Sequence, residues 1–162
     1  MNITRKTPFS IDQVFGGIAT IPILAKLHGS VEEGDIIPPT WNKNLHPNIM
    51  HTWNNAYQAL SEANHIRIIG YSLPVTDSYL KYLFKSAVVK SKHLKRIDVL
   101  CLDPDGSVKS RYDDFIRFHN YRFKASSVEE YLDLLHGYTE KKNSSEPVSC
   151  VQLENAHNDF FK

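Results

Sequence analysis

The sequence predicts an α/β fold, a Rossmann-like parallel sheet with flanking helices. Three short runs rich in apolar residues, Ile66–Tyr71, Ile97–Leu102 and Tyr121–Ala125, have the length and composition of strands. The segments after them repeat apolar residues every three or four positions, as amphipathic helices do. Strands that alternate with helices predict βαβ units with right-handed crossovers. A chain of 162 residues fits one domain of this kind.

The predicted elements begin with a short strand over Pro22–Leu27, followed by a long loop over His28–His46. A loop of this length in a compact domain is usually functional or mobile. The first helix is expected to begin at Pro47, a residue that suits the first helical position. Its apolar positions recur at helical spacing as far as Ala63.

A polar turn follows the strand Ile66–Tyr71 and leads into the next predicted helix. We expect Thr76 to cap this helix, with Val75 and Leu80 forming a hydrophobic staple across its first turn. The helix should end near the basic cluster Lys90–Arg96, where cations suit the negative end of the helix dipole.

The strand–helix pattern then repeats twice. Asp103–Gly106 reads as a turn and Val108–Phe118 as a helix. After the last strand, Ser126 and Ser127 each precede a glutamate by three residues, which is the pattern of a capping box. This pattern predicts a final helix over Val128–His136.

The composition changes after Gly137, where charged and small polar residues replace the apolar periodicity. We therefore divide the chain into a partial domain over residues 1–137 and a polar, flexible tail over residues 138–162. A frayed helix is expected near Leu153–Phe161.

The bulk composition excludes several classes of function. A formal charge of +1 provides no general attraction to nucleic acid or to an anionic membrane. No apolar stretch approaches the roughly 20 residues that span a bilayer, and no signal-peptide core follows Met1–Ser10. Cys101 and Cys150 are too few for a four-thiolate zinc module, so no metal is expected. These observations predict a cytoplasmic protein.

Three polar groups fall where predicted strands end, which is where open α/β sheets bind ligands. They are His28–Ser30, the turn from Gly70 to Asp77, and Asp103. Histidine can serve as a general base, a glycine and serine can approach a phosphate, and an aspartate can bind a ribose hydroxyl. Each group also has a structural interpretation, as a packed histidine, a turn or a helix start. Together the residues favour a nucleotide cleft.

Three segments in this order, Lys26–Ser30, Ile37–Trp41 and Ile68–Asp77, resemble the bacterial sirtuin-like domain. The similarity extends over roughly Ile23–Leu135. It implies a Rossmann-like sheet and, as in several members of that family, cleavage of NAD in antiphage defence. It does not imply a zinc-dependent protein deacetylase, because the four zinc-binding cysteines of deacetylases are missing.

The resemblance also implies roles for single residues. His28 matches the catalytic histidine, which would activate a ribose hydroxyl while the bond to nicotinamide breaks. Tyr71 takes the place of the threonine in the Gly-Thr-Ser turn of deacetylases. The implied cofactor-binding set is Gly29, Gly70, Tyr71, Ser72, Asp77 and Asp103.

Two parts of the family's pattern are absent: the Gly-Ala-Gly nucleotide loop and the Thr-Asn-Tyr-Asp motif that carries a catalytic asparagine. The chain thus resembles the C-terminal half of the domain, without the N-terminal strands. We expect weak NAD binding, no activity from this chain alone, and an open sheet edge that pairs with a second copy or a partner chain. The alternatives are a non-catalytic remnant or interaction module that uses this edge, and an unrelated α/β nucleotide or phosphate binder.

Overall fold

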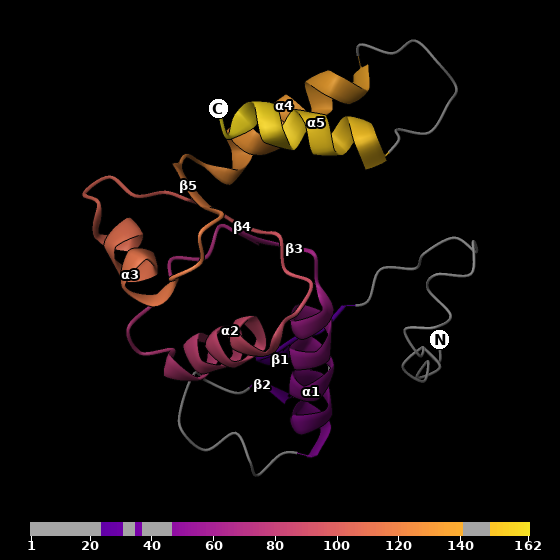
Figure 1. Ribbon diagram of the computed structural model, residues 1–162, viewed down its shortest axis with the longest axis vertical. Helices are drawn as coiled ribbons and strands as arrows, with labels where there is room; N and C mark the ends of the chain where they lie inside the picture. Colours follow the sequence, from indigo (N-terminus) through magenta and orange to yellow (C-terminus); the bar gives the residue numbers. More distant parts are fainter. Residues whose placement is uncertain (1–23, 31–34, 37–46, 141–149) are drawn as a thin grey trace.

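The computed structural model describes residues 24–30, 35–36, 47–140 and 150–162. At its centre is a three-stranded parallel sheet in the order β3-β4-β5 (Figure 1). The strands are β3 (His65–Ile69), β4 (Arg96–Cys101) and β5 (Tyr121–Ala125). The predicted α/β class and the Rossmann-like parallel sheet are confirmed.

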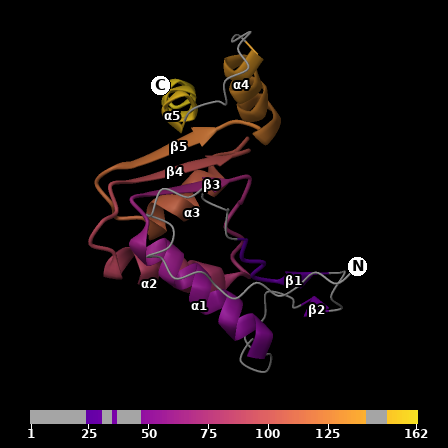
Figure 2. The ribbon, with the colours of Figure 1, turned by 90° about the vertical axis from the view of Figure 1, so that its right-hand side faces the viewer.

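Helices cover both faces of this sheet. They are α1 (Pro47–Glu62), α2 (Ser78–Lys90), α3 (Ser107–Phe115), α4 (Val128–Glu140) and α5 (Cys150–Phe160). Figures 1 and 2 show α1, α2 and α3 on one face, here called the inner face, and α4 and α5 on the other, the outer face. Two successive right-handed crossovers in one direction place α2 and α3 on the same side of the sheet.

The core lies between the sheet and the inner helices. Ile66 and Ile68 of β3 and Ile97 and Val99 of β4 are buried there, because side chains two residues apart on a strand share a face. Tyr112 of α3, with no exposed surface, packs into the same cluster. The packing of these short strands fixes the end of the sheet at which the polar turns lie.

The predicted first strand over Pro22–Leu27 is wrong in its described part, since residues 24–27 form no strand. Instead β1 (Gly29–Ser30) pairs antiparallel with β2 (Asp35–Ile36), apart from the central sheet. The cause is a turn in which the Gly29 N–H donates to the carbonyl of Lys26 (3.1 Å) and Gly29 takes a φ of 80°. Glycine adopts this left-handed backbone without steric cost.

The start of α2 also differs from the prediction. Asp77, not Thr76, is the N-cap, and its Oδ1 accepts from the Leu80 N–H (3.3 Å). The Asp77 N–H donates to the carbonyl of Pro74 (3.0 Å), so a turn delays the helix by one residue. Val75 is 85% exposed, so the predicted staple is wrong.

The interpretation of residues 138–162 as a flexible tail is wrong for the described part of this segment. α4 continues to Glu140, and α5 lies beside it on the outer face of the sheet. Ala156 and His157 of α5 are buried. Glu154 and His157 of α5 meet the polar side chains of Arg96 and Asp98 on the sheet, an arrangement that mean hydropathy cannot reveal. Residues 141–149 lie outside the described residues.

Candidate functional site

His28 is held in a short turn beside the inner helices. The Trp53 indole N–H of α1 donates to the carbonyl of Leu27 (2.9 Å), which ties this turn to the domain. Gly29, the next residue, supplies the left-handed backbone that the turn requires. Gly29 therefore has a structural reason to be glycine, whatever else it contacts.

The turn brings His28 to the polar segment after β3. The His28 Nε2 lies 3.4 Å from Oδ2 of Asp77, and the Tyr71 hydroxyl donates to the same oxygen (2.8 Å). The Asp77 side chain is 5% exposed, whereas that of His28 is 40% exposed. Three residues that the sequence predicts for the site thus meet around one buried carboxylate.

This arrangement suits proton transfer at the imidazole. A carboxylate that faces one ring nitrogen orients the ring and stabilises the imidazolium that forms when the ring takes up a proton. Burial, with the nearby Asp77 charge, raises the pKa of Tyr71, so its hydroxyl stays protonated and donates to Asp77. The exposed fraction of His28 leaves the ring accessible to a ligand.

Two residues of α3 hold the backbone of the turn after β3. The Tyr112 hydroxyl donates to the carbonyl of Tyr71 (2.7 Å), and the Arg111 Nε donates to the carbonyl of Ser72 (3.2 Å). Leu73, which follows Ser72 on the way to α2, is buried. Its φ of 51° is unusual for leucine. The sequence analysis did not place Tyr112 in the candidate site. The available signal was its hydroxyl, because a buried tyrosine needs a hydrogen-bond partner.

Gly70 lies close to other parts of the protein and not to an open space that a phosphate could fill. Its N–H donates to the carbonyl of Leu100 (2.8 Å), and a Cβ at this position would stand 3.0 Å from Cγ2 of Val128. Its φ is 71°. The close packing of α4 therefore gives a structural reason for glycine at position 70. The Gly70 N–H is already engaged in a hydrogen bond to the sheet.

Asp103 lies at the end of β4, where the sequence predicts it, and caps α3. Its Oδ1 accepts from the N–H of Val108 (2.9 Å) and its Oδ2 from the N–H of Lys109 (3.0 Å). Both amides belong to the first turn of α3, where N–H groups have no partner within the helix. The carboxylate therefore positions α3 and is not part of the group around His28 and Asp77.

A polar network that the sequence did not indicate lies on the outer face. Asp98 of β4 accepts from Arg122 of β5 (2.7 and 2.9 Å), from Arg96 (2.8 Å) and faces His157 of α5 (2.8 Å). Burial alone would raise the pKa of Asp98, but hydrogen bonds from Arg122 and His157 outweigh burial and hold it well below its usual range. The available signal was a single aspartate within an apolar strand.

Comparison of the chain with protein-family models, with curated proteins and with solved structures finds no match. Within the described residues, no three His, Cys, Asp or Glu side chains gather as a metal site would require. None of the helices in the described ranges is long and apolar enough to cross a membrane.

Proposed function

We propose that this chain provides the histidine side of a sirtuin-like site that binds and cleaves NAD. The resemblance of three ordered segments suggests the reaction, an NAD glycohydrolase activity in cytoplasmic antiphage defence. The observation that supports it best is the contact between His28 and Asp77, 3.4 Å apart. Two segments that the resemblance pairs in one site meet there, beside Tyr71.

The proposed reaction consumes NAD and water and releases nicotinamide, ADP-ribose and a proton. The bond between the ribose and the nicotinamide nitrogen breaks, and the bonding pair leaves with nicotinamide. His28 takes up the proton of a ribose hydroxyl, and Asp77 stabilises the resulting imidazolium. A water oxygen then bonds to the ribose carbon that nicotinamide has left. The ribose oxygen takes its proton back from His28, and the proton lost by the water is the one released. Tyr71 keeps the Asp77 carboxylate oriented through its hydrogen bond (2.8 Å).

The residues fit the ribose end of the dinucleotide better than its pyrophosphate. A histidine, a tyrosine and a carboxylate at the end of β3 are groups that exchange hydrogen bonds with hydroxyls. The Gly70 N–H and both oxygens of Asp103 are engaged in protein hydrogen bonds. Because the sequence has no Gly-x-Gly loop either, we propose that a partner supplies the pyrophosphate contacts and that this chain alone binds weakly.

Weak binding is best tested at the histidine itself. We expect NAD, titrated to about 10 mM, to shift the imidazole signals of His28 in a proton–nitrogen correlation spectrum, since affinities in the millimolar range still give fast-exchange shifts. His28→Ala should remove the shifted signals and any nicotinamide release. Asp77→Asn should weaken the response while keeping the cap on α2.

The matched control is His119→Ala, because His119 is an exposed histidine beyond α3. It should leave the NAD response of His28 unchanged. If NAD at this concentration moves no signal of His28, Tyr71 or Ser72, the proposal is wrong. Measurable nicotinamide release by wild type that His28→Ala leaves unchanged would remove His28 from the mechanism.

The second candidate function is an interaction module that uses the sheet edges. Among the described residues, β3 and β5 each pair with β4 alone, so both present an edge. Such an edge offers backbone groups to another strand. Sedimentation of the purified chain as a defined oligomer, with no response to NAD, would favour this function over the first.

A further inference from the structure

An apolar stripe runs along the exposed side of α2. Val75, Tyr82 and Val89 are 85%, 64% and 80% exposed. Tyr82 and Val89 lie seven residues apart on α2, and Val75 lies seven residues before Tyr82, in the turn that leads into the helix. Tyr82 and Val89 lie on one side of α2 because seven residues make about two turns, and Val75 precedes the helix. Exposed apolar residues that align in this way mark an interaction surface more often than single exposed residues do.

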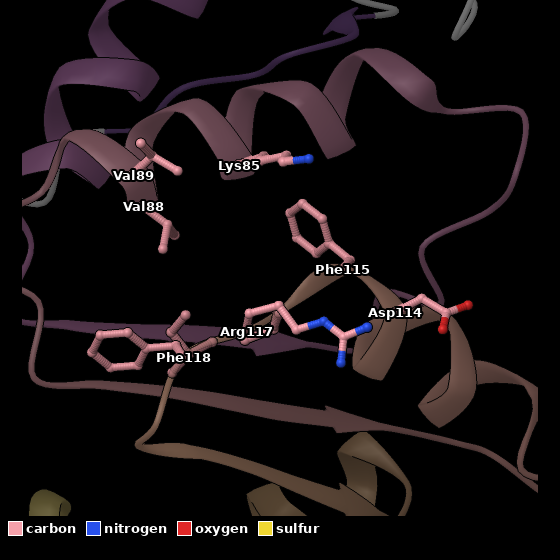
Figure 3. A pocket seen from close by; sticks show the side chains of 9 residues that line it. Lys85, Val88, Val89, Asp114, Phe115, Arg117 and Phe118 are labelled. Carbon is pink, nitrogen blue, oxygen red and sulfur yellow. The ribbon is translucent and has the colours of Figure 1, made fainter.

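The stripe borders a groove between α2 and α3. One cavity of about 360 Å³ is lined by Val88 and Val89 of α2 and by Phe115 and the segment after α3. A second, of about 530 Å³, is lined by Val75 and Tyr82 and shares Phe115 with the first, so the two are adjacent. Figure 3 shows the side chains of α2 facing Phe115, Arg117 and Phe118 across the first cavity.

The groove carries an excess of positive charge. Its lining contains the four cations Lys81, Lys85, Arg111 and Arg117 but the single carboxylate Asp114. The Lys81 Nζ lies 5.8 Å from the ring centre of Phe115, so the charge stands directly over the apolar floor. A complementary ligand has apolar groups on one side and carboxylates beside them.

We propose that this groove binds an acidic amphipathic helix of a partner protein. Two observations support a helix: the groove lies between two helices, and two adjacent cavities can receive successive side chains. Glutamates or aspartates that flank the apolar residues would face Lys81, Lys85 and Arg117. This proposal is independent of NAD binding.

The charges favour a different chain over a second copy of this one. If two copies met through their α2 faces, two surfaces with the same excess of positive charge would oppose each other. Like charges across an interface oppose association. An acidic partner replaces this repulsion with attraction, and its binding should weaken as salt is added.

The test uses the full chain and a fluorescent synthetic helix of about three heptads, with leucine at a and d and glutamate at e and g. We expect saturable binding by fluorescence anisotropy. Tyr82→Glu and Lys85→Glu should each weaken it at least about tenfold. Both side chains are exposed, so the fold should survive, as circular dichroism will show. Val151→Glu on α5, also exposed, is the matched control and should bind as wild type does.

Three outcomes would overturn the proposal. In the first, a peptide of the same composition with a scrambled order, or one with lysine in place of glutamate, binds equally well. In the second, Val151→Glu weakens binding as much as Tyr82→Glu does. In the third, the chain alone sediments as a dimer that Tyr82→Glu dissociates, which would make a second copy the occupant of the groove.

Discussion

His157 of α5 and Asp98 of β4 lie 2.8 Å apart, Nε2 to Oδ2, and each side chain is 1% exposed. The Tyr131 hydroxyl of α4 lies 2.9 Å from the other ring nitrogen of His157. Because a carboxylate only accepts, Nε2 carries the hydrogen in this pair, and a neutral ring then accepts from Tyr131 through Nδ1. The contact joins both outer helices to the central strand.

We expect Asp98→Ala to destabilise the domain by about 3–5 kcal/mol, because it leaves the partly buried Arg96 and Arg122 without their counter-charge and the buried His157 without its acceptor. Arg122 and His157 would lose their acceptor together. Urea unfolding measures the change. The control is Asp133→Ala on α4, an exposed position, where the effect should stay within about 0.5 kcal/mol. Equal effects at the two positions would contradict a structural role for Asp98.

The same residue should make stability depend on pH. The pKa of Asp98 is lowered in the folded state, against an ordinary value of about 3.9 when unfolded. Its ionisation therefore stabilises the fold above the unfolded pKa, and this contribution is lost as the pH falls toward the folded pKa. Glu154, whose pKa is lowered by Arg96 and Arg67 against the effect of burial, acts in the same direction.

The measurement is the free energy of unfolding between about pH 2 and pH 7 for wild type and Asp98→Asn. The difference between them should be constant above about pH 5 and shrink below about pH 4. Two curves that stay parallel to the lowest pH would show that Asp98 does not contribute through its charge.

Gly70→Ala should cost about 1–2 kcal/mol from the left-handed backbone alone, and the contact with Val128 should add to this cost. In a double-mutant cycle, Val128→Ala should recover the second part but not the first. The matched control is Gly137→Ala within α4, where no atom stands within 4 Å of the added carbon. That substitution should stabilise the helix by about 0.5–1 kcal/mol. A cycle with no coupling would mean that Val128 moves aside freely.

Tyr112→Phe should cost about 1–3 kcal/mol, because it leaves the partly buried carbonyl of Tyr71 without its donor. It should also shift the imidazole signals of His28, since Tyr71 and Asp77 connect the two residues. Tyr82→Phe removes a hydroxyl from a 64% exposed ring and is the comparison variant for both measurements. If Tyr112→Phe leaves stability unchanged, the hydrogen bond does not hold the turn.

The strands of the central sheet could be predicted because the sequence features that indicate them belong to residues adjacent in the chain. The strands Ile66–Tyr71, Ile97–Leu102 and Tyr121–Ala125 match β3, β4 and β5 within two residues at each end. Their β-branched and aromatic composition and the polar turns between them are properties of neighbouring residues. The Ser127 side chain accepts from the Glu130 N–H as the serine–glutamate spacing indicated.

The site was predictable in part. The sequence predicted His28, Tyr71 and Asp77 for one site, and the structure brings these three together, although the described residues before His28 form no strand. It could not show that the Gly70 N–H and the Asp103 carboxylate are engaged by Leu100 and by α3. Those hydrogen bonds join residues that only the packing of strands and helices brings into contact.

By itself, the sequence determined the α/β class, the three parallel strands and the polar turn that follows the first of them. Only the tertiary structure decided the place of the last helix and the partners of its polar residues. The reason is physical: hydropathy averages along the chain, while a buried charge is stabilised by groups distant in sequence. In the sequence, Glu154 and His157 resemble residues of a solvated tail, yet they contact Arg96 and Asp98 on the outer face of the sheet.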